Sequence, residues 1–111
     1  MKKILLSLLT ISLCQLASAQ ISITTIGTPY TQNFDAMPAT TASGFHAMNI
    51  PGWAIYEKGQ NANDSLRIGA GAQNAGDTYN FGTAAATDRA IGGVASGTNQ
   101  PHFGCSFQNN T

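Results

Sequence analysis

Residues 102–108 read His-Phe-Gly-Cys-Ser-Phe-Gln, a stretch in which apolar residues alternate with small or polar ones. Successive side chains of a β-strand point to opposite faces of a sheet, so Phe103, Cys105 and Phe107 would share one face. This period of two predicts a half-buried strand over residues 102–108. The same alternation over residues 21–23 predicts a second strand near the start of the chain.

The rest of the chain after residue 20 is divided into short segments by turn-forming residues. All 12 glycines and all 4 prolines lie there, and because both residue types destabilise helix interiors we predict no helix. Further strand candidates are residues 30–34, 53–57, 65–68, 78–81 and 89–92. Short strands at this spacing predict an all-β fold, specifically an antiparallel β-sandwich or barrel.

The first 19 residues are typical of a secretory signal peptide. Two lysines precede an apolar run over residues 4–16, and small side chains at positions 17–19 precede Gln20. The run is shorter than the roughly 20 apolar residues of a membrane-spanning helix, and Leu13 rather than a small residue precedes Cys14, so a retained anchor and a lipoprotein signal are weaker alternatives. We therefore predict cleavage between Ala19 and Gln20, a secreted or cell-surface location, and no membrane span after cleavage.

The predicted mature chain is poor in charge. Residues 20–111 carry three basic and five acidic side chains, a net charge of −2. Such a surface has no basic patch that could neutralise nucleic-acid phosphates or attract anionic lipid. We therefore expect no nucleic-acid partner.

Nothing in the chain matches a common catalytic motif. The sequence contains no Gly-x-Ser-x-Gly elbow, phosphate-binding loop or His-Glu-x-x-His motif, and His46 and His102 lack metal-ligand spacing. Cys105 is the single cysteine after the leader, which rules out an internal disulfide there, and we expect it to be a core residue. His102 lies three positions from Cys105 and would face the other side of the strand. We predict that this segment is not an enzyme.

Six short motifs occur in an order that suggests a family. They are YTQNFDAM (30–37), PGWAIYE (51–57), GDTYNFG (76–82), TDRAIGG (87–93), ASGT (95–98) and FGCSFQNNT (103–111). This succession resembles the N-terminal β-sandwich module of secreted multidomain proteins of the Bacteroidota, which often end in a type IX (Por) secretion sorting domain. The resemblance implies a jelly-roll or concanavalin-like sandwich, no known catalytic residues, and further strands and domains downstream. We interpret residues 20–111 as the first, incomplete part of this module; the alternative is a small domain that is complete as it stands.

Three aromatic residues are candidates for stacking against sugar rings: Trp53, Tyr56 and Tyr79. Trp53 and Tyr56 lie three positions apart, so on one regular strand they would face opposite sides. The alternative is that Trp53 is a core residue whose N–H has a hydrogen-bond partner. Tyr79 and Phe81 would share one face, most simply the core.

Oxygen-bearing side chains near the expected turns could hold a structural calcium ion. They are Asp64, Asp77, Asp88, Asn61, Asn63, Asn74 and Asn80. No loop matches the ordered register of a calcium-binding loop, so hydrogen bonds that stabilise the turns are the alternative. Asp88 and Arg89 are expected to form a local ion pair or cap.

Two segments fit glycosylation patterns. Asp64-Ser65-Leu66 resembles the O-glycosylation site of the same bacterial group, which makes Ser65 a candidate acceptor. Residues 63–65 and 109–111 fit the N-glycosylation pattern, which we discount in a bacterial protein.

The sequence leaves two hypotheses for function. The first is a non-catalytic extracellular β-sandwich that spaces or positions other domains, or contacts proteins at the cell surface. The second is a carbohydrate-binding module that targets an attached hydrolase, nuclease or adhesin to glycans.

Overall fold

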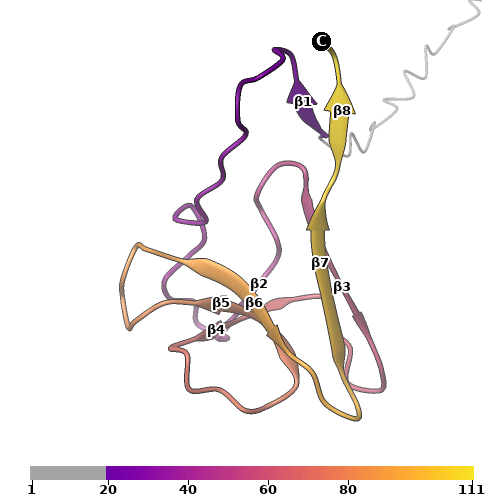
Figure 1. The fold of residues 1–111 in the computed structure, drawn as a ribbon. Helices are drawn as coiled ribbons and strands as arrows, with labels where there is room; N and C mark the ends of the chain where they lie inside the picture. The colour runs from indigo at the N-terminus through magenta and orange to yellow at the C-terminus, as the bar shows by residue number, and fades with distance from the viewer. Residues whose placement is uncertain (1–19) are drawn as a thin grey trace, which may run out of the picture.

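The computed structural model describes residues 20–111, and the leader predicted over residues 1–19 lies outside the described residues. The described chain consists of strands, turns and loops, and it contains no helix (Figure 1). This confirms the prediction of an all-β fold. The strands are β1 (Ile21–Ile23), β2 (Phe45–His46), β3 (Trp53–Lys58), β4 (Leu66–Gly69), β5 (Asp77–Phe81), β6 (Ala90–Val94), β7 (Gln100–Cys105) and β8 (Phe107–Asn109). Nowhere in the described part does a helix have the length and hydropathy to cross a membrane.

The strands pair into three hydrogen-bonded groups. One is a four-stranded sheet of order β2-β4-β5-β6, another is a β3–β7 ribbon, and the third is a β1–β8 ribbon. The pairs β1–β8 and β4–β5 are parallel, whereas the other three pairs are antiparallel. The expectation of antiparallel pairing throughout is therefore wrong at these two pairs. Within residues 20–111 the three groups are not joined into one closed sheet.

The strand predicted over residues 102–108 is divided at Ser106. Up to Cys105 the chain pairs with β3, and from Phe107 onward it pairs with β1. Ser106 makes the change of partner possible, because its N–H donates to Gly52 O (2.9 Å) and its own carbonyl accepts from Ile21 N (2.8 Å). One apolar stretch therefore connects the two ribbons of the molecule.

Residues 30–34 do not form the strand expected there. The side chains of this segment pack instead, Tyr30 edge-to-face against Phe107 and Phe34 edge-to-face against Trp53. Their ring centroids are 5.3 Å and 4.9 Å apart, respectively. The segment is thus attached to the fold by aromatic contacts and not by a backbone ladder.

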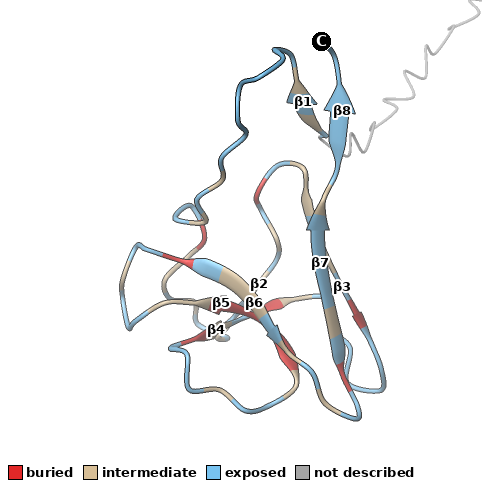
Figure 2. Cartoon of the chain, in the orientation of Figure 1, coloured by how far each residue is buried: buried red, intermediate tan, exposed pale blue. Residues whose placement is uncertain are grey.

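The apolar core is small and is completed by polar side chains. Met37, Ile50 and Leu66 form the buried apolar cluster, and partly buried neighbours pack against it. The buried polar residues are Glu57, Asp77, Thr78, Asn80, Arg89 and Asn99, which outnumber the buried apolar ones. Figure 2 shows the buried positions spread over β4, β5, the end of β3 and the turn before β7. Polar groups inside a protein need hydrogen-bond partners, so these residues determine much of the architecture.

Candidate functional site

Glu57 is the centre of a buried polar cluster at the end of β3. It is 2 % exposed, because the alternation along β3 turns Trp53, Ile55 and Glu57 inward. Its Oε1 accepts hydrogen bonds from the Thr78 N–H (2.7 Å) and the Thr78 hydroxyl (2.8 Å), and its Oε2 accepts from Asn63 N (2.9 Å). Burial acts to raise the pKa of Glu57, but hydrogen bonds from Asn63, Thr78 and Asn99 outweigh it and lower the pKa to about 2. Glu57 is therefore ionised.

Asp77 is a second buried carboxyl group beside Glu57. It lies at the start of β5, is 5 % exposed, and accepts a hydrogen bond from Thr78 N (3.0 Å). Burial raises the pKa of Asp77, and the charge of Glu57 and a hydrogen bond with it raise that pKa further. The same surroundings therefore favour the charged form of one carboxyl group and disfavour the charged form of the other. Both side chains are enclosed, so neither can meet a substrate from solution.

Asn99 completes the cluster from the turn between β6 and β7. It is 1 % exposed, its Nδ2 donates to Gly76 O (3.4 Å), and its side chain contributes to the lowered pKa of Glu57. Its Oδ1 is buried and has no hydrogen-bond partner within the described residues. Gly59 permits the close approach of this turn to the end of β3, because a Cβ at Gly59 would overlap Thr98 O.

Arg89 forms a second polar cluster, with Asn80. The guanidinium is buried, with Nε donating to Asn80 Oδ1 (2.7 Å) and Nη2 to Asn80 O (2.7 Å). Asn80 in turn contacts Pro38 O (2.9 Å) and His46 Nε2 (2.8 Å) through its Nδ2. The expected local ion pair between Asp88 and Arg89 is wrong, because Asp88 is exposed and the arginine turns inward to Asn80. Asn80 is used in this network and not in a calcium site.

Trp53 is a core residue, as the alternative interpretation held. It is half-buried, packs on Phe34 and donates its indole N–H to Tyr30 Oη (3.3 Å). Tyr56 lies on the opposite face of β3 and is 58 % exposed, so the two cannot form one stacking platform. Tyr79 is fully buried, stacks on Phe81 at 5.0 Å on the shared face expected, and is closed to any ligand.

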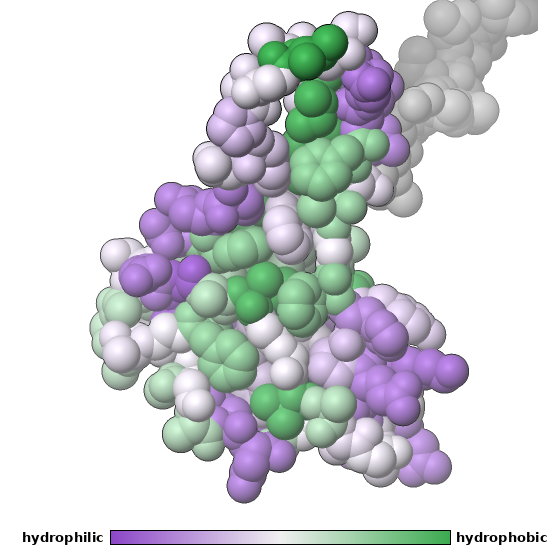
Figure 3. Space-filling view, viewed as in Figure 1, coloured by the Kyte–Doolittle hydropathy of each residue, from purple (hydrophilic) through white to green (hydrophobic). Residues whose placement is uncertain are grey.

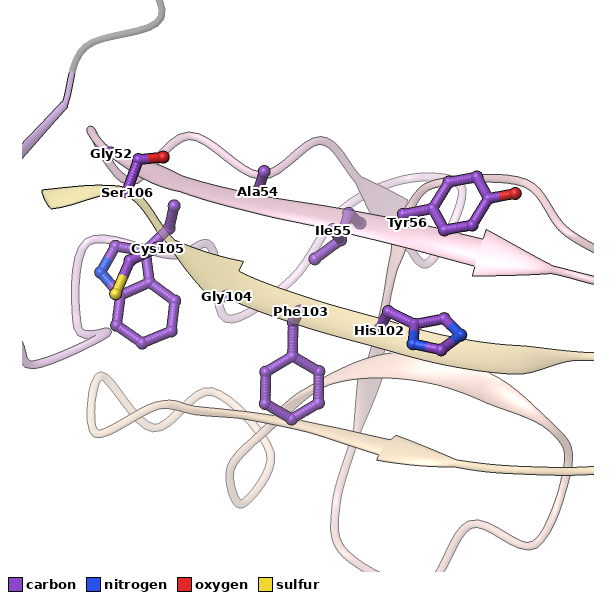
Figure 4. Close-up of a pocket in the computed structure, with 10 residues that line it drawn as sticks. Gly52, Ala54, Ile55, Tyr56, His102, Phe103, Gly104, Cys105 and Ser106 are labelled. Atoms are coloured by element: carbon purple, nitrogen blue, oxygen red, sulfur yellow. The ribbon is translucent and has the colours of Figure 1, made fainter.

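The exposed aromatic partner of Tyr56 is His102. The two residues are opposite each other in the antiparallel β3–β7 register, and their ring centroids are 6.0 Å apart with the planes tilted by 32°. Figure 4 shows both rings side by side near one end of the ribbon. They border a groove of about 470 Å³ lined by residues 52–56 and 102–106. The pairing of Tyr56 with His102 was not predicted, because it depends on the register between two strands that are distant in the sequence.

Cys105 lies on the other face of the ribbon from His102. It is opposite Trp53 in the register, whereas His102 is opposite Tyr56. Cys105 is a free, half-buried thiol. As predicted from their spacing, His102 and Cys105 face opposite sides of the strand and do not form a nucleophile–base pair.

Ser65, the candidate O-glycosylation site, is held in a tight turn. Its N–H donates to Asn63 Oδ1 (2.9 Å) and its hydroxyl to Asn63 O (3.2 Å). Asp64 adopts a positive φ of 51°, which aspartate tolerates, and its Oδ1 accepts from Glu57 N (2.7 Å). Asn63 and Asp64 thus stabilise a turn, as the alternative to calcium ligation proposed.

The oxygen ligands considered for calcium are not gathered at one point. Asp77 pairs with Val94 at one end of the β5–β6 hairpin, whereas Asp88 precedes β6 at the other end. No group of three or more His, Cys, Asp or Glu side chains in residues 20–111 is arranged to hold a metal ion. The burial of Glu57 was not predicted, although period-two alternation places it on the same face as Trp53 and Ile55.

Comparisons with known proteins give no assignment. A scan against protein-family models finds no match, and searches of curated proteins and of solved structures find no significant match either. The resemblance of the sequence to the Bacteroidota module therefore stays a prediction.

Proposed function

We propose that residues 20–111 form a non-catalytic β-module of a secreted or cell-surface bacterial protein, where it positions other domains. The observation that supports this is that two side chains able to act as acid or base are buried and hydrogen bonded within the fold. Glu57 and Asp77 are 2 % and 5 % exposed, and they bond to the backbone of neighbouring turns and strands. Groups that could act as acid and base are thus committed to holding the fold together.

Two exposed aromatic side chains support a role in contacts between domains. Phe103 and Phe107, from β7 and β8, are 44 % and 51 % exposed. Figure 3 shows hydrophobic surface extending over this part of the molecule. Exposed apolar surface of this kind is typical of regions that pack against another protein segment.

The test uses the full chain, expressed with its leader in a Gram-negative host. We expect the intact mass of the exported product to match a chain that begins at Gln20. We also expect no turnover of polysaccharides, nucleic acids or peptides by this product. Turnover that disappears in Asp77→Asn would contradict the proposal.

A second candidate is a carbohydrate-binding module, and the Tyr56–His102 pair favours it. The pair lies on the outward face of the β3–β7 ribbon, where an apolar face of a sugar ring could stack on Tyr56. A polysaccharide retention assay separates the two functions. Glycan binding predicts retention that Tyr56→Ala abolishes and that Phe103→Ala, on the other face of the same ribbon, leaves intact. A positioning role predicts no retention by the unmodified chain.

A further inference from the structure

Gln20 is the first residue of the chain that remains once the predicted leader is cleaved. It is exposed and lies directly before β1. A glutamine side chain ends in a carboxamide, two methylene groups from its Cα, and can bend back to the nitrogen of its own residue. An N-terminal glutamine is therefore a chemically reactive group, whereas the same residue inside a chain is not.

The ladder of the β1–β8 ribbon starts after Gln20. The first backbone contact is made by Ile21, whose N–H donates to Ser106 O (2.8 Å), and Ile21 lies opposite Phe107 in the register. The nitrogen and the side chain of Gln20 both precede this contact. Terminal residues that are not tied into a ladder keep conformational freedom, so the carboxamide of Gln20 can reach its own nitrogen without disturbing the ribbon.

The reaction open to such a terminus is the closure of a lactam. The α-amino nitrogen attacks the side-chain Cδ and forms a new N–Cδ bond in a five-membered ring. The Cδ–Nε2 bond breaks, and Nε2 leaves as ammonia with a proton that the α-amino group gives up. The two groups belong to one residue and meet as an intramolecular pair, and the step needs no oxidant, reductant or second reactant. Since α-amino groups titrate at roughly pH 7.7–8.0, the reactive amine is present near neutrality.

We propose that Gln20 is a modification site and cyclises to pyroglutamate after the leader is removed. The lactam is neutral, so the exported chain loses the positive charge of its N-terminus. The inference rests on the proposed function, because it requires export and cleavage between Ala19 and Gln20. The change is confined to Gln20 and preserves the amide N–H of Ile21, the first donor of the ladder.

The modification has a structural role because β1 follows Gln20 directly. β1 is three residues long. Its second residue, Ser22, accepts a hydrogen bond at Oγ from Asn110 Nδ2 (2.6 Å), and the carbonyl of its third, Ile23, accepts from Asn110 N (2.8 Å). Figure 1 shows β1 beside β8, at the end of the molecule away from the four-stranded sheet. Removal of a few terminal residues would therefore remove one strand of this ribbon.

A pyroglutamyl residue protects the strand from such trimming. Aminopeptidases recognise the free α-ammonium group of a chain, and the lactam nitrogen does not provide one. Without cyclisation, Gln20 alone separates the new terminus from the ladder. The cyclised chain should therefore keep the β1–β8 ribbon in the presence of an aminopeptidase.

Mass spectrometry of the exported full chain tests the site. The purified chain is incubated in neutral buffer beside a synthetic peptide of residues 20–26. We expect the mass of a chain that begins at Gln20 to fall by one molecule of ammonia, at a rate similar to that of the peptide, since Gln20 is exposed and precedes the ladder. Gln20→Asn is the matched control. It keeps a terminal carboxamide, but its ring would have four members, so it should lose no ammonia.

The outcomes separate this inference from the proposed function. A chain that begins at Gln20 and keeps its full mass while the peptide cyclises overturns the modification and leaves the proposed function intact. A product that retains its leader, or begins at another residue, overturns the cleavage that both require. With an added aminopeptidase, the cyclised chain should keep its mass and its Tm, whereas Gln20→Asn should lose terminal residues and melt at a lower temperature. Equal trimming or equal resistance of the two chains would overturn the protective role.

Discussion

The carboxylate of Glu57 accepts two hydrogen bonds from Thr78, one from its backbone N–H at 2.7 Å and one from its hydroxyl at 2.8 Å. Thr78 lies on β5 in the four-stranded sheet, whereas Glu57 lies on β3 in the ribbon. One residue pair therefore joins two groups of strands that share no backbone ladder.

Thr78→Val should weaken the fold without changing the shape of the side chain. The valine cannot donate to Glu57, so a buried carboxylate loses one of its hydrogen bonds. We expect the free energy of unfolding to fall by about 1–3 kcal/mol, measured by urea denaturation. Thr87→Val, at an exposed position, is the control and should have almost no effect.

Glu57 should make the protein sensitive to acid. Its pKa is lowered from 4.5 to about 2 in the folded chain, so its contribution to stability is present above the unfolded pKa and is lost as the pH falls from about 4.5 to about 2. Urea denaturation at several pH values should show this loss. Glu57→Gln should remove that part of the pH dependence, and an unchanged profile would contradict the assignment.

Asp77 should lower the stability of the folded chain as the pH rises toward neutrality. Because its pKa is raised, the folded state favours the protonated form, and stability is lost as the pH rises through the folded pKa. At pH 7, Asp77→Asn should therefore be more stable than the unmodified chain. The comparison is a thermal unfolding series against Asp88→Asn, and a lower Tm for Asp77→Asn would show that the carboxylate is needed in its charged form.

Arg89→Lys should be destabilising although it keeps the charge. Lysine has no planar guanidinium with which to contact Asn80 Oδ1 and Asn80 O together. We expect a loss of about 1–3 kcal/mol, since buried oxygens of Asn80 are left without donors. Arg67→Lys, on the exposed face of β4, should change the free energy of unfolding far less, and equal losses would show that the network is not the cause.

The alternation of side chains predicted much of the local structure. Period two placed Trp53 and Tyr56 on opposite faces of β3, and Tyr79 and Phe81 on one face of β5, and the structure confirms both. These predictions succeeded because they depend only on the geometry of a single strand.

Features that involve distant segments could not be predicted in the same way. The parallel pairs β1–β8 and β4–β5, and the change of partner at Ser106, depend on backbone groups that are far apart in sequence. The burial of Glu57 was not predicted for another reason. A carboxylate on a strand is normally exposed, and only the donors from Asn63 and Thr78 make its burial tolerable.

The parallel pairing of β1 with β8 has a mechanical consequence. Ile21 lies opposite Phe107 and Ile23 opposite Asn109, with closing hydrogen bonds from Ile21 N to Ser106 O and from Asn110 N to Ile23 O, each 2.8 Å long. Tension that enters before Ile21 and leaves after Asn109 would pull these strands along their length, in shear. The bonds would then bear the load together and break at once, so the ribbon would resist stretching far better than a hairpin that unzips bond by bond.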